Sequence, residues 1–180
     1  MPVYAALLRA INLGSRNKIS MPDLRELFEA VGADEVRTHV QSGNVVFRST
    51  ERSPAKLVTA VEKRISADLG LDIRVLLRTK AEMAKIVAGS PFAGDADHAT
   101  LHVTFLVDKP DPDRAAKIDP SKYEPDRYEV IGRDVHLHCP NGYGRSKLSN
   151  AFFEKKLDQV GTTRNWKTVT TLVEMTGAGG

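Results

Sequence analysis

The first 78 residues alternate short apolar runs with amphipathic segments in the order strand, helix, strand, strand, helix, strand. Val3–Leu8 is an apolar run without helical period, which is typical of a strand buried on both faces. From Leu24 onward, apolar residues recur at helical spacing until Gly32 ends the segment. This order predicts a split βαβ, or ferredoxin-like, unit, in which two helices cover one face of a four-stranded antiparallel sheet.

A hairpin and a second helix complete this first unit. Residues 36–41 and 45–48 are predicted strands, with a Ser-Gly-Asn turn between them. Ser53-Pro54 is a typical helix start, and the alternation of apolar residues over 73–78 predicts the last strand.

The rest of the chain repeats this theme with a different ending. The predicted elements are a helix at 81–88, a strand at 101–107, a helix near 113–118, strands at 128–131 and 135–139, and helices from about Ser146 and near Asn165. This second copy looks incomplete or rearranged, because it ends in helix rather than strand. We therefore predict an α+β fold of two ferredoxin-like (alpha-beta plait) subdomains, residues 1–79 and residues 80–180, with extra C-terminal helices in the second.

Composition limits the compartment and the class of partner. Cys139 is the only cysteine, so it cannot form an internal disulfide, and a reducing compartment, the cytoplasm, is expected. No apolar run reaches the roughly 18 residues that a membrane span requires, so no membrane contact is expected. The formal net charge of +3 permits an anionic partner without demanding one.

Four polar loops contain the residue types that bind anions. The loop over 9–18 combines Gly14, two asparagines and three cations just before a helix N-terminus, and residues 140–147 place small residues and two cations before another helix. The turn at 42–44 and the segment 161–167 add amides, hydroxyls, a guanidinium and an indole. The candidate ligand-binding residues are Arg9, Asn12, Asn17, Lys18, Ser42, Asn44, Arg145, Lys147, Arg164, Asn165 and Trp166.

Each loop also has a purely structural interpretation. Asn12 and Asn17 would satisfy backbone groups of a turn, and the 42–44 segment would be an ordinary hairpin turn. Ser146 would cap a helix, and Trp166, the only tryptophan, would be a core residue.

No pattern indicates a metal, a cofactor or a catalytic group. His136 and His138 share one face of a predicted strand, and His102 lies on a different strand. No carboxylate or thiolate has a spacing that would complete a metal site with them, so the histidines are interpreted as residues of a half-exposed sheet face. Cys139 lacks a recognisable base. The segment around Gly142 lacks the spacing of a Walker A loop, so a nucleotide triphosphatase is disfavoured.

Several motifs occur together in one order along nearly the whole chain. They are Leu8-Arg9-Ala10-Ile11-Asn12-Leu13-Gly14, Asn17-Lys18, Met21, Gln41-Ser42-Gly43-Asn44-Val45, Pro91-Phe92, Gly144-Arg145-Ser146-Lys147-Leu148 and Thr163-Arg164-Asn165-Trp166. In these motifs the chain resembles DUF1697, a bacterial family without a characterised function. The resemblance implies two ferredoxin-like subdomains and implies no activity or cofactor. Ala10 stands where the loop of this family more often has glycine.

The favoured functional hypothesis is that the polar loops form one basic cleft for a phosphorylated partner, either a nucleotide or an RNA strand. Cations and backbone N–H groups would hold phosphates, while Trp166 or Tyr143 would stack on a base. One alternative is an enzyme for a small anionic substrate, with Arg9 and Lys147 stabilising charge. A second alternative is that the loops only hold the fold together.

Overall fold

The computed structural model describes residues 1–177, which divide into two compact units. The first comprises Met1–Lys85 together with the segment from Thr171 onward, and the second comprises Ile86–Thr170. Each unit contains one four-stranded antiparallel sheet. Within the described residues, no helix combines the length and the apolar character needed to cross a bilayer.

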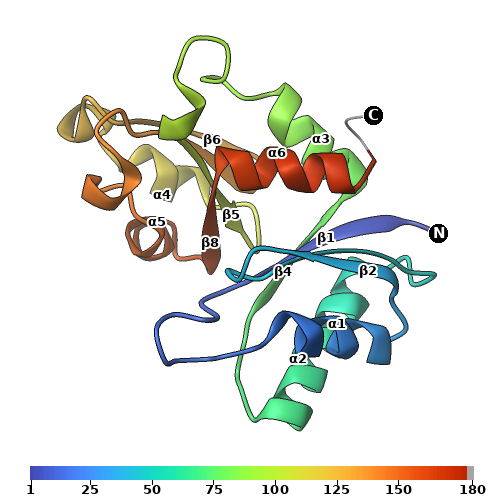
Figure 1. Cartoon of the computed structure of the whole chain (residues 1–180). Coiled ribbons are helices and arrows are strands. Elements are labelled where there is room, and N and C mark those ends of the chain that lie inside the picture. Colours follow the sequence, from blue (N-terminus) through green and yellow to red (C-terminus); the bar gives the residue numbers. More distant parts are fainter. Residues whose placement is uncertain (178–180) are drawn as a thin grey trace. The chain divides into compact units, whose positions relative to one another are not determined.

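The first unit has the predicted ferredoxin-like order. Its elements are β1 (Val3–Leu8), α1 (Met21–Ala30), β2 (Asp34–His39), β3 (Asn44–Arg48), α2 (Pro54–Leu69) and β4 (Val75–Thr79). The strands are arranged β2-β3-β1-β4, and both helices pack on the same face of the sheet (Figure 1).

Local capping and apolar packing explain these elements. The Oγ of Ser20 accepts a hydrogen bond from the Asp23 N–H, and the Oγ of Ser53 accepts one from the Lys56 N–H, so each helix begins at a satisfied N-cap. Phe28 of α1 packs on Phe47 of β3 with ring centroids 5.2 Å apart. The helices are thereby fixed on the sheet by burial of their apolar faces.

The second unit repeats the same order and the same strand arrangement. Its elements are β5 (Leu101–Leu106), α4 (Pro112–Ala116), β6 (Arg127–Ile131), β7 (Asp134–His138), α5 (Asn150–Leu157) and β8 (Gly161–Asn165). The strand order β6-β7-β5-β8 corresponds element by element to that of the first sheet. The α+β fold with two ferredoxin-like subdomains is therefore confirmed. Two further helices, α3 (Lys80–Ala88) and α6 (Trp166–Met175), each contain a boundary between the units.

The structure corrects the prediction for the end of the second unit. The copy is complete, because β8 supplies the strand that the sequence did not indicate. Its buried positions are filled by glycine, threonine and arginine, so it lacks the apolar alternation of an ordinary strand. The helix expected from about Ser146 begins instead at Asn150, because the Oγ of Ser149 accepts from the Phe152 N–H as the N-cap.

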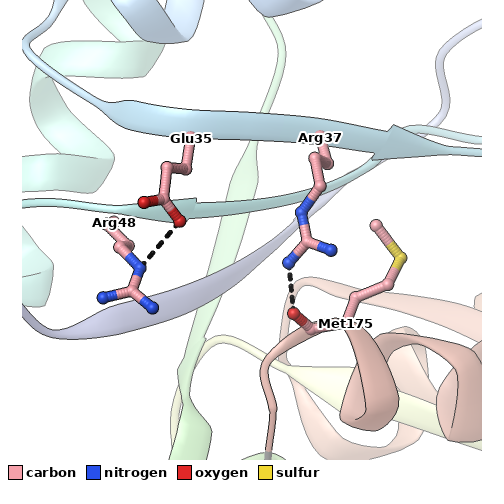
Figure 2. Close-up of polar contacts among 4 residues, drawn as sticks. All are labelled: Glu35, Arg37, Arg48 and Met175. Atoms are coloured by element: carbon pink, nitrogen blue, oxygen red, sulfur yellow. Dashed lines mark hydrogen bonds and ion pairs between the residues drawn. The ribbon is translucent and has the colours of Figure 1, made fainter.

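The C-terminal end of α6 is held within the first unit by a cation from β2. Helix α6 has no basic residue in its last turn. A guanidinium N–H of Arg37 donates to the carbonyl oxygen of Met175, as Figure 2 shows. Nearby, Glu35 pairs with Arg48 at 2.9 Å. Arg37 thus supplies the positive charge that a helix C-terminus favours.

Candidate functional site

Asn12 joins the two polar loops of the first unit. Its Nδ2 donates to the carbonyl oxygens of Ile19 at 3.0 Å and Gln41 at 2.8 Å, and its Oδ1 accepts from the Ile19 N–H at 2.9 Å. One side chain therefore closes the loop after β1 and connects it to the β2–β3 turn. The sequence placed Asn12 in a binding loop, and the structure shows that its amide is used within the protein.

The same loop is closed a second time by Asn17. The Nδ2 of Asn17 donates to the carbonyl oxygen of Ala10 at 3.1 Å, and the Asn17 carbonyl accepts from the Asn12 N–H at 3.0 Å. Ala10, Asn12 and Asn17 all have φ between 49° and 58°. Ala10 therefore takes a left-handed conformation, which glycine adopts with less strain than alanine.

The β2–β3 turn is also held by hydrogen bonds and close packing within the protein. Asn44 is fully buried, and its Nδ2 donates to the His39 carbonyl at 2.8 Å and to the Ser42 Oγ at 3.1 Å. Gly43 has a φ of +92°, and a Cβ at this position would lie 2.7 Å from the Cδ1 of Ile11. Only glycine allows this close approach of the turn to the first loop.

The polar candidates of the first unit thus form one interlocked structure. The amides of Asn12, Asn17 and Asn44 serve backbone or turn groups. Of the cations predicted with them, Arg9 is half-buried and Lys18 is exposed.

In the second unit, four loops meet at one end of the sheet. Leu101, at the start of β5, pairs with His138, at the end of β7, and His102 pairs with Asn165, at the end of β8. Arg127, the first residue of β6, also pairs with His138. The segments that precede β5 and β6 and those that follow β7 and β8 therefore lie at this end, and two separate cavities open among them.

The larger cavity, called here the Trp166 cavity, has a volume of about 750 Å³. Helix α3, the segment before β5 and the first turn of α6 supply its walls. Its lining residues are Val87, Ala93, His98, Ala99, Asn165, Trp166, Lys167 and Thr170. Two of the predicted ligand residues, Asn165 and Trp166, therefore lie in one cavity.

The wall around Trp166 is fixed in place. Trp166 is 4% exposed, and the His98 ring meets it edge-on with centroids 6.0 Å apart. His98 is held in turn by its Nε2, which lies 2.9 Å from the Ala93 carbonyl oxygen. The Oδ1 of Asn165 accepts from the Thr168 N–H at 2.9 Å, so Asn165 caps the first turn of α6.

The smaller cavity, called here the basic cavity, contains two other predicted residues, Arg145 and Lys147, and has a volume of about 260 Å³. It lies between the segment before β6 and the loop after β7. The complete lining is Lys122, Tyr123, Glu124, Pro125, Asp126, Asn141, Gly142, Arg145 and Lys147. The second unit thus divides the predicted candidates between two sites.

Arg164 has a different environment from its neighbours. It is 7% exposed, and its Nη1 donates to the Thr162 Oγ1 at 2.6 Å and to the Thr163 carbonyl at 3.1 Å. Burial lowers the pKa of its guanidinium to about 10. By strand alternation it faces away from Thr163, whose Oγ1 bonds Asn150 of α5. Arg164 lines neither cavity.

His102 and His136 are strand residues of the second sheet, and Cys139 directly follows β7. His136 pairs with Val103 and His102 with Leu137, so the two histidines lie on opposite faces. Burial lowers the pKa of both imidazoles and raises the pKa of the Cys139 thiol. Among residues 1–177, no three His, Cys, Asp or Glu side chains are placed to hold a metal ion.

Most lining residues of the two cavities were not predicted from the sequence, and three of them, His98, Lys122 and Lys167, carry a basic side chain. His98 lies in an irregular polar segment without periodicity, and Lys122 belongs to the short 3₁₀ turn Pro120–Tyr123. Lys167 was visible beside Trp166, but a lone cation in the first turn of a helix opposes the helix dipole and therefore gives no signal of packing or capping.

Comparison with known proteins finds one matching family model and a solved structure with a similar fold. The family model described as "Protein of unknown function (DUF1697)" matches residues 1–136. A solved structure, that of the conserved bacterial protein SP0830 from Streptococcus pneumoniae, is similar with a TM-score of 0.78 and 21% sequence identity, covering 97% of this chain and 98% of that chain. At this identity the likeness establishes the fold alone. No curated protein matches the sequence.

Proposed function

Because the chain belongs to the DUF1697 family, whose function is unknown, we propose a function from the geometry of the second unit: it binds a phosphorylated ligand of the mononucleotide class in the Trp166 cavity. The observation that carries this proposal is the combination, in one cavity of about 750 Å³, of an apolar wall with one amine and one amide at the start of α6.

The size and walls of the cavity suit a compact ligand with a planar ring. Small-molecule sites are typically concavities of about 300–1,000 Å³ that are mostly apolar, with a few polar groups fixing orientation. Val87, Ala93 and Ala99 supply apolar surface, and the exposed ring of His98, packed edge-on against the buried Trp166, offers aromatic surface to a ring.

A phosphorylated ligand also needs a place for its negative charge, and the first turn of α6 provides one. Lys167 lines the cavity there, beside the capping residue Asn165. Helix α6 has ten residues, and the N-terminal end of its dipole favours an anion. A ligand with its ring against Trp166 and its phosphate at Lys167 uses both parts of the site.

These features favour a nucleotide over an RNA strand. A single-stranded nucleic acid is bound along a track of cations with successive stacking surfaces. The Trp166 cavity has one lysine and no arginine among its lining residues, so it offers no such track. We assign the loops of the first unit a structural role and not a part in ligand binding. The reason is that Asn12, Asn17 and Asn44 all form hydrogen bonds within that unit.

Calorimetry with adenosine monophosphate, adenosine and inorganic phosphate tests the proposal. We expect the monophosphate to bind more tightly than either fragment. Lys167→Gln should weaken binding of the monophosphate at least tenfold while leaving adenosine unchanged, because it removes the positive charge that we place at the phosphate. Lys155→Gln, an exposed lysine on α5 outside both cavities, is the matched control and should bind as the wild type does.

Two results would contradict the proposal. The first is a melting temperature that none of the common mononucleotides moves, since a ligand at one hundred times its Kd stabilises a protein by about 2.7 kcal/mol. The second is equal weakening by Lys167→Gln and Lys155→Gln. A steep fall of affinity with salt for a single-stranded RNA, together with no mononucleotide binding, would support the RNA hypothesis instead.

A further inference from the structure

The basic cavity of the second unit is not needed for the function proposed above. It shares no lining residue with the Trp166 cavity, and its volume of about 260 Å³ is about one third as large. We propose that the basic cavity is a second ligand site, which binds a small phosphomonoester bearing hydroxyl groups, of the sugar phosphate class.

Three cations from two separate segments surround this cavity. Lys122 comes from the 3₁₀ turn before β6, and Arg145 and Lys147 come from the loop after β7. All three side chains are exposed. A guanidinium binds phosphate through two parallel hydrogen bonds, and the two amines add charge without a fixed geometry, so together they match a dianionic phosphate.

The segments that carry these cations are tied together before any ligand arrives. The Oγ of Ser146, between Arg145 and Lys147, donates to the Oδ2 of Asp126 at 2.8 Å. The same hydroxyl accepts from the Leu148 N–H at 3.0 Å. One serine therefore connects the loop after β7 to the segment before β6, so the two sides of the cavity are held at a fixed separation.

The loop after β7 is braced at its other points. The Gly142 N–H donates to the Cys139 carbonyl at 3.0 Å, and the hydroxyl oxygen of Tyr143 accepts from the Asn150 N–H at 2.9 Å. The Tyr143 ring stacks on His102 of β5 with centroids 4.5 Å apart. A loop fixed in this way loses little conformational freedom on binding, which is what a preorganised site requires.

The carboxylates of the cavity define the rest of the ligand. Glu124 and Asp126 line it together with the amide of Asn141. Two carboxylates beside three cations leave a net charge of about +1, which is weak attraction for a polyanion. Carboxylate and amide oxygens accept hydrogen bonds from hydroxyl groups. A phosphate on a hydroxyl-bearing body satisfies both kinds of lining group at once.

The volume separates this ligand from that of the Trp166 cavity. At about 260 Å³ the basic cavity lies just below the range of about 300–1,000 Å³ typical of drug-sized ligands. A sugar phosphate fits such a space, while a nucleotide with its base does not. The two cavities therefore select ligands of different size, and binding at one is expected to be independent of binding at the other.

Calorimetry with ribose 5-phosphate, free ribose and inorganic phosphate on the full-length protein tests this inference. We expect the ester to bind more tightly than inorganic phosphate, and free ribose to bind weakest. Arg145→Gln and Lys147→Gln should each weaken binding of the ester at least tenfold. Lys155→Gln, which is exposed and outside the cavity, and Lys167→Gln, which alters the Trp166 cavity, should leave it unchanged.

The outcomes are distinct. Binding of the ester that neither Arg145→Gln nor Lys147→Gln changes, or no binding of the ester at millimolar concentration, overturns the site. Binding of inorganic phosphate as tight as that of the ester overturns the assignment to a hydroxyl-bearing ligand. Urea unfolding of each variant shows that the fold is retained, and the Lys167→Gln arm keeps a failure here separate from a failure of the nucleotide site.

Discussion

Replacing Asn12 by alanine distinguishes a structural first loop from a ligand-binding one. The substitution removes two donated and one accepted hydrogen bond and leaves the Ile19 N–H and the carbonyls of Ile19 and Gln41 without these partners. At about 0.5–1.5 kcal/mol for each hydrogen bond, the free energy of unfolding should fall by about 2–4 kcal/mol. Asparagine also tolerates the φ of 55° at this position better than alanine does.

Urea denaturation measures this loss. With a slope of about 2 kcal/mol per molar urea, the unfolding midpoint should fall by about 1–2 M. Lys18→Ala, an exposed side chain in the same loop, is the control and should stay within about 0.5 kcal/mol of the wild type. If Asn12→Ala unfolds at the wild-type midpoint but loses affinity for a phosphorylated ligand, the structural interpretation of the loop is wrong.

Two further predictions concern the turn of the first unit and a buried histidine of the second. Gly43→Ala should destabilise the protein by about 1–3 kcal/mol more than Gly14→Ala. Both glycines have positive φ, but only at position 43 would the added Cβ clash, with the side chain of Ile11. Equal losses of stability in the two variants would refute the close packing. Burial lowers the pKa of His136, so below pH 6.5 the unfolded chain binds protons more readily than the folded protein does. The free energy of unfolding should therefore fall between pH 7 and pH 5 by up to about 1.4 kcal/mol per pH unit for this group. In His136→Gln the free energy of unfolding should depend less steeply on pH. Equal pH dependence of the variant and the wild type would contradict the burial argument.

The elements with strong local signals were predictable from the sequence. Helix α1 begins at a serine cap and repeats apolar residues at helical spacing, and both properties are readable over a few residues. Strand β8 has no such signal, because its buried positions are occupied by Gly161, Thr162 and Arg164. Its place is set by pairing with β5, which is a property of the sheet and not of the segment.

The candidate site was predictable in part for a related physical reason. The sequence identified polar residues in loops as candidates, but the type of a residue does not reveal its partner. Asn12 bonds to backbone groups, while Asn165 combines a cap with a place in a cavity wall. The contribution of His98 depends on the fold bringing it against Trp166, 68 residues later in the chain. A cavity is a tertiary property, so its complete lining requires the structure.

The indole N–H resonance of Trp166 tests the central claim most directly. The chain has a single tryptophan, so its indole gives one unambiguous signal in a proton–nitrogen correlation spectrum. During titration with adenosine monophosphate this resonance should shift and saturate with the Kd found by calorimetry, and in Lys167→Gln it should saturate at a concentration at least tenfold higher. An indole signal that stays in place while the nucleotide binds would show that the ligand occupies another site and would contradict the account.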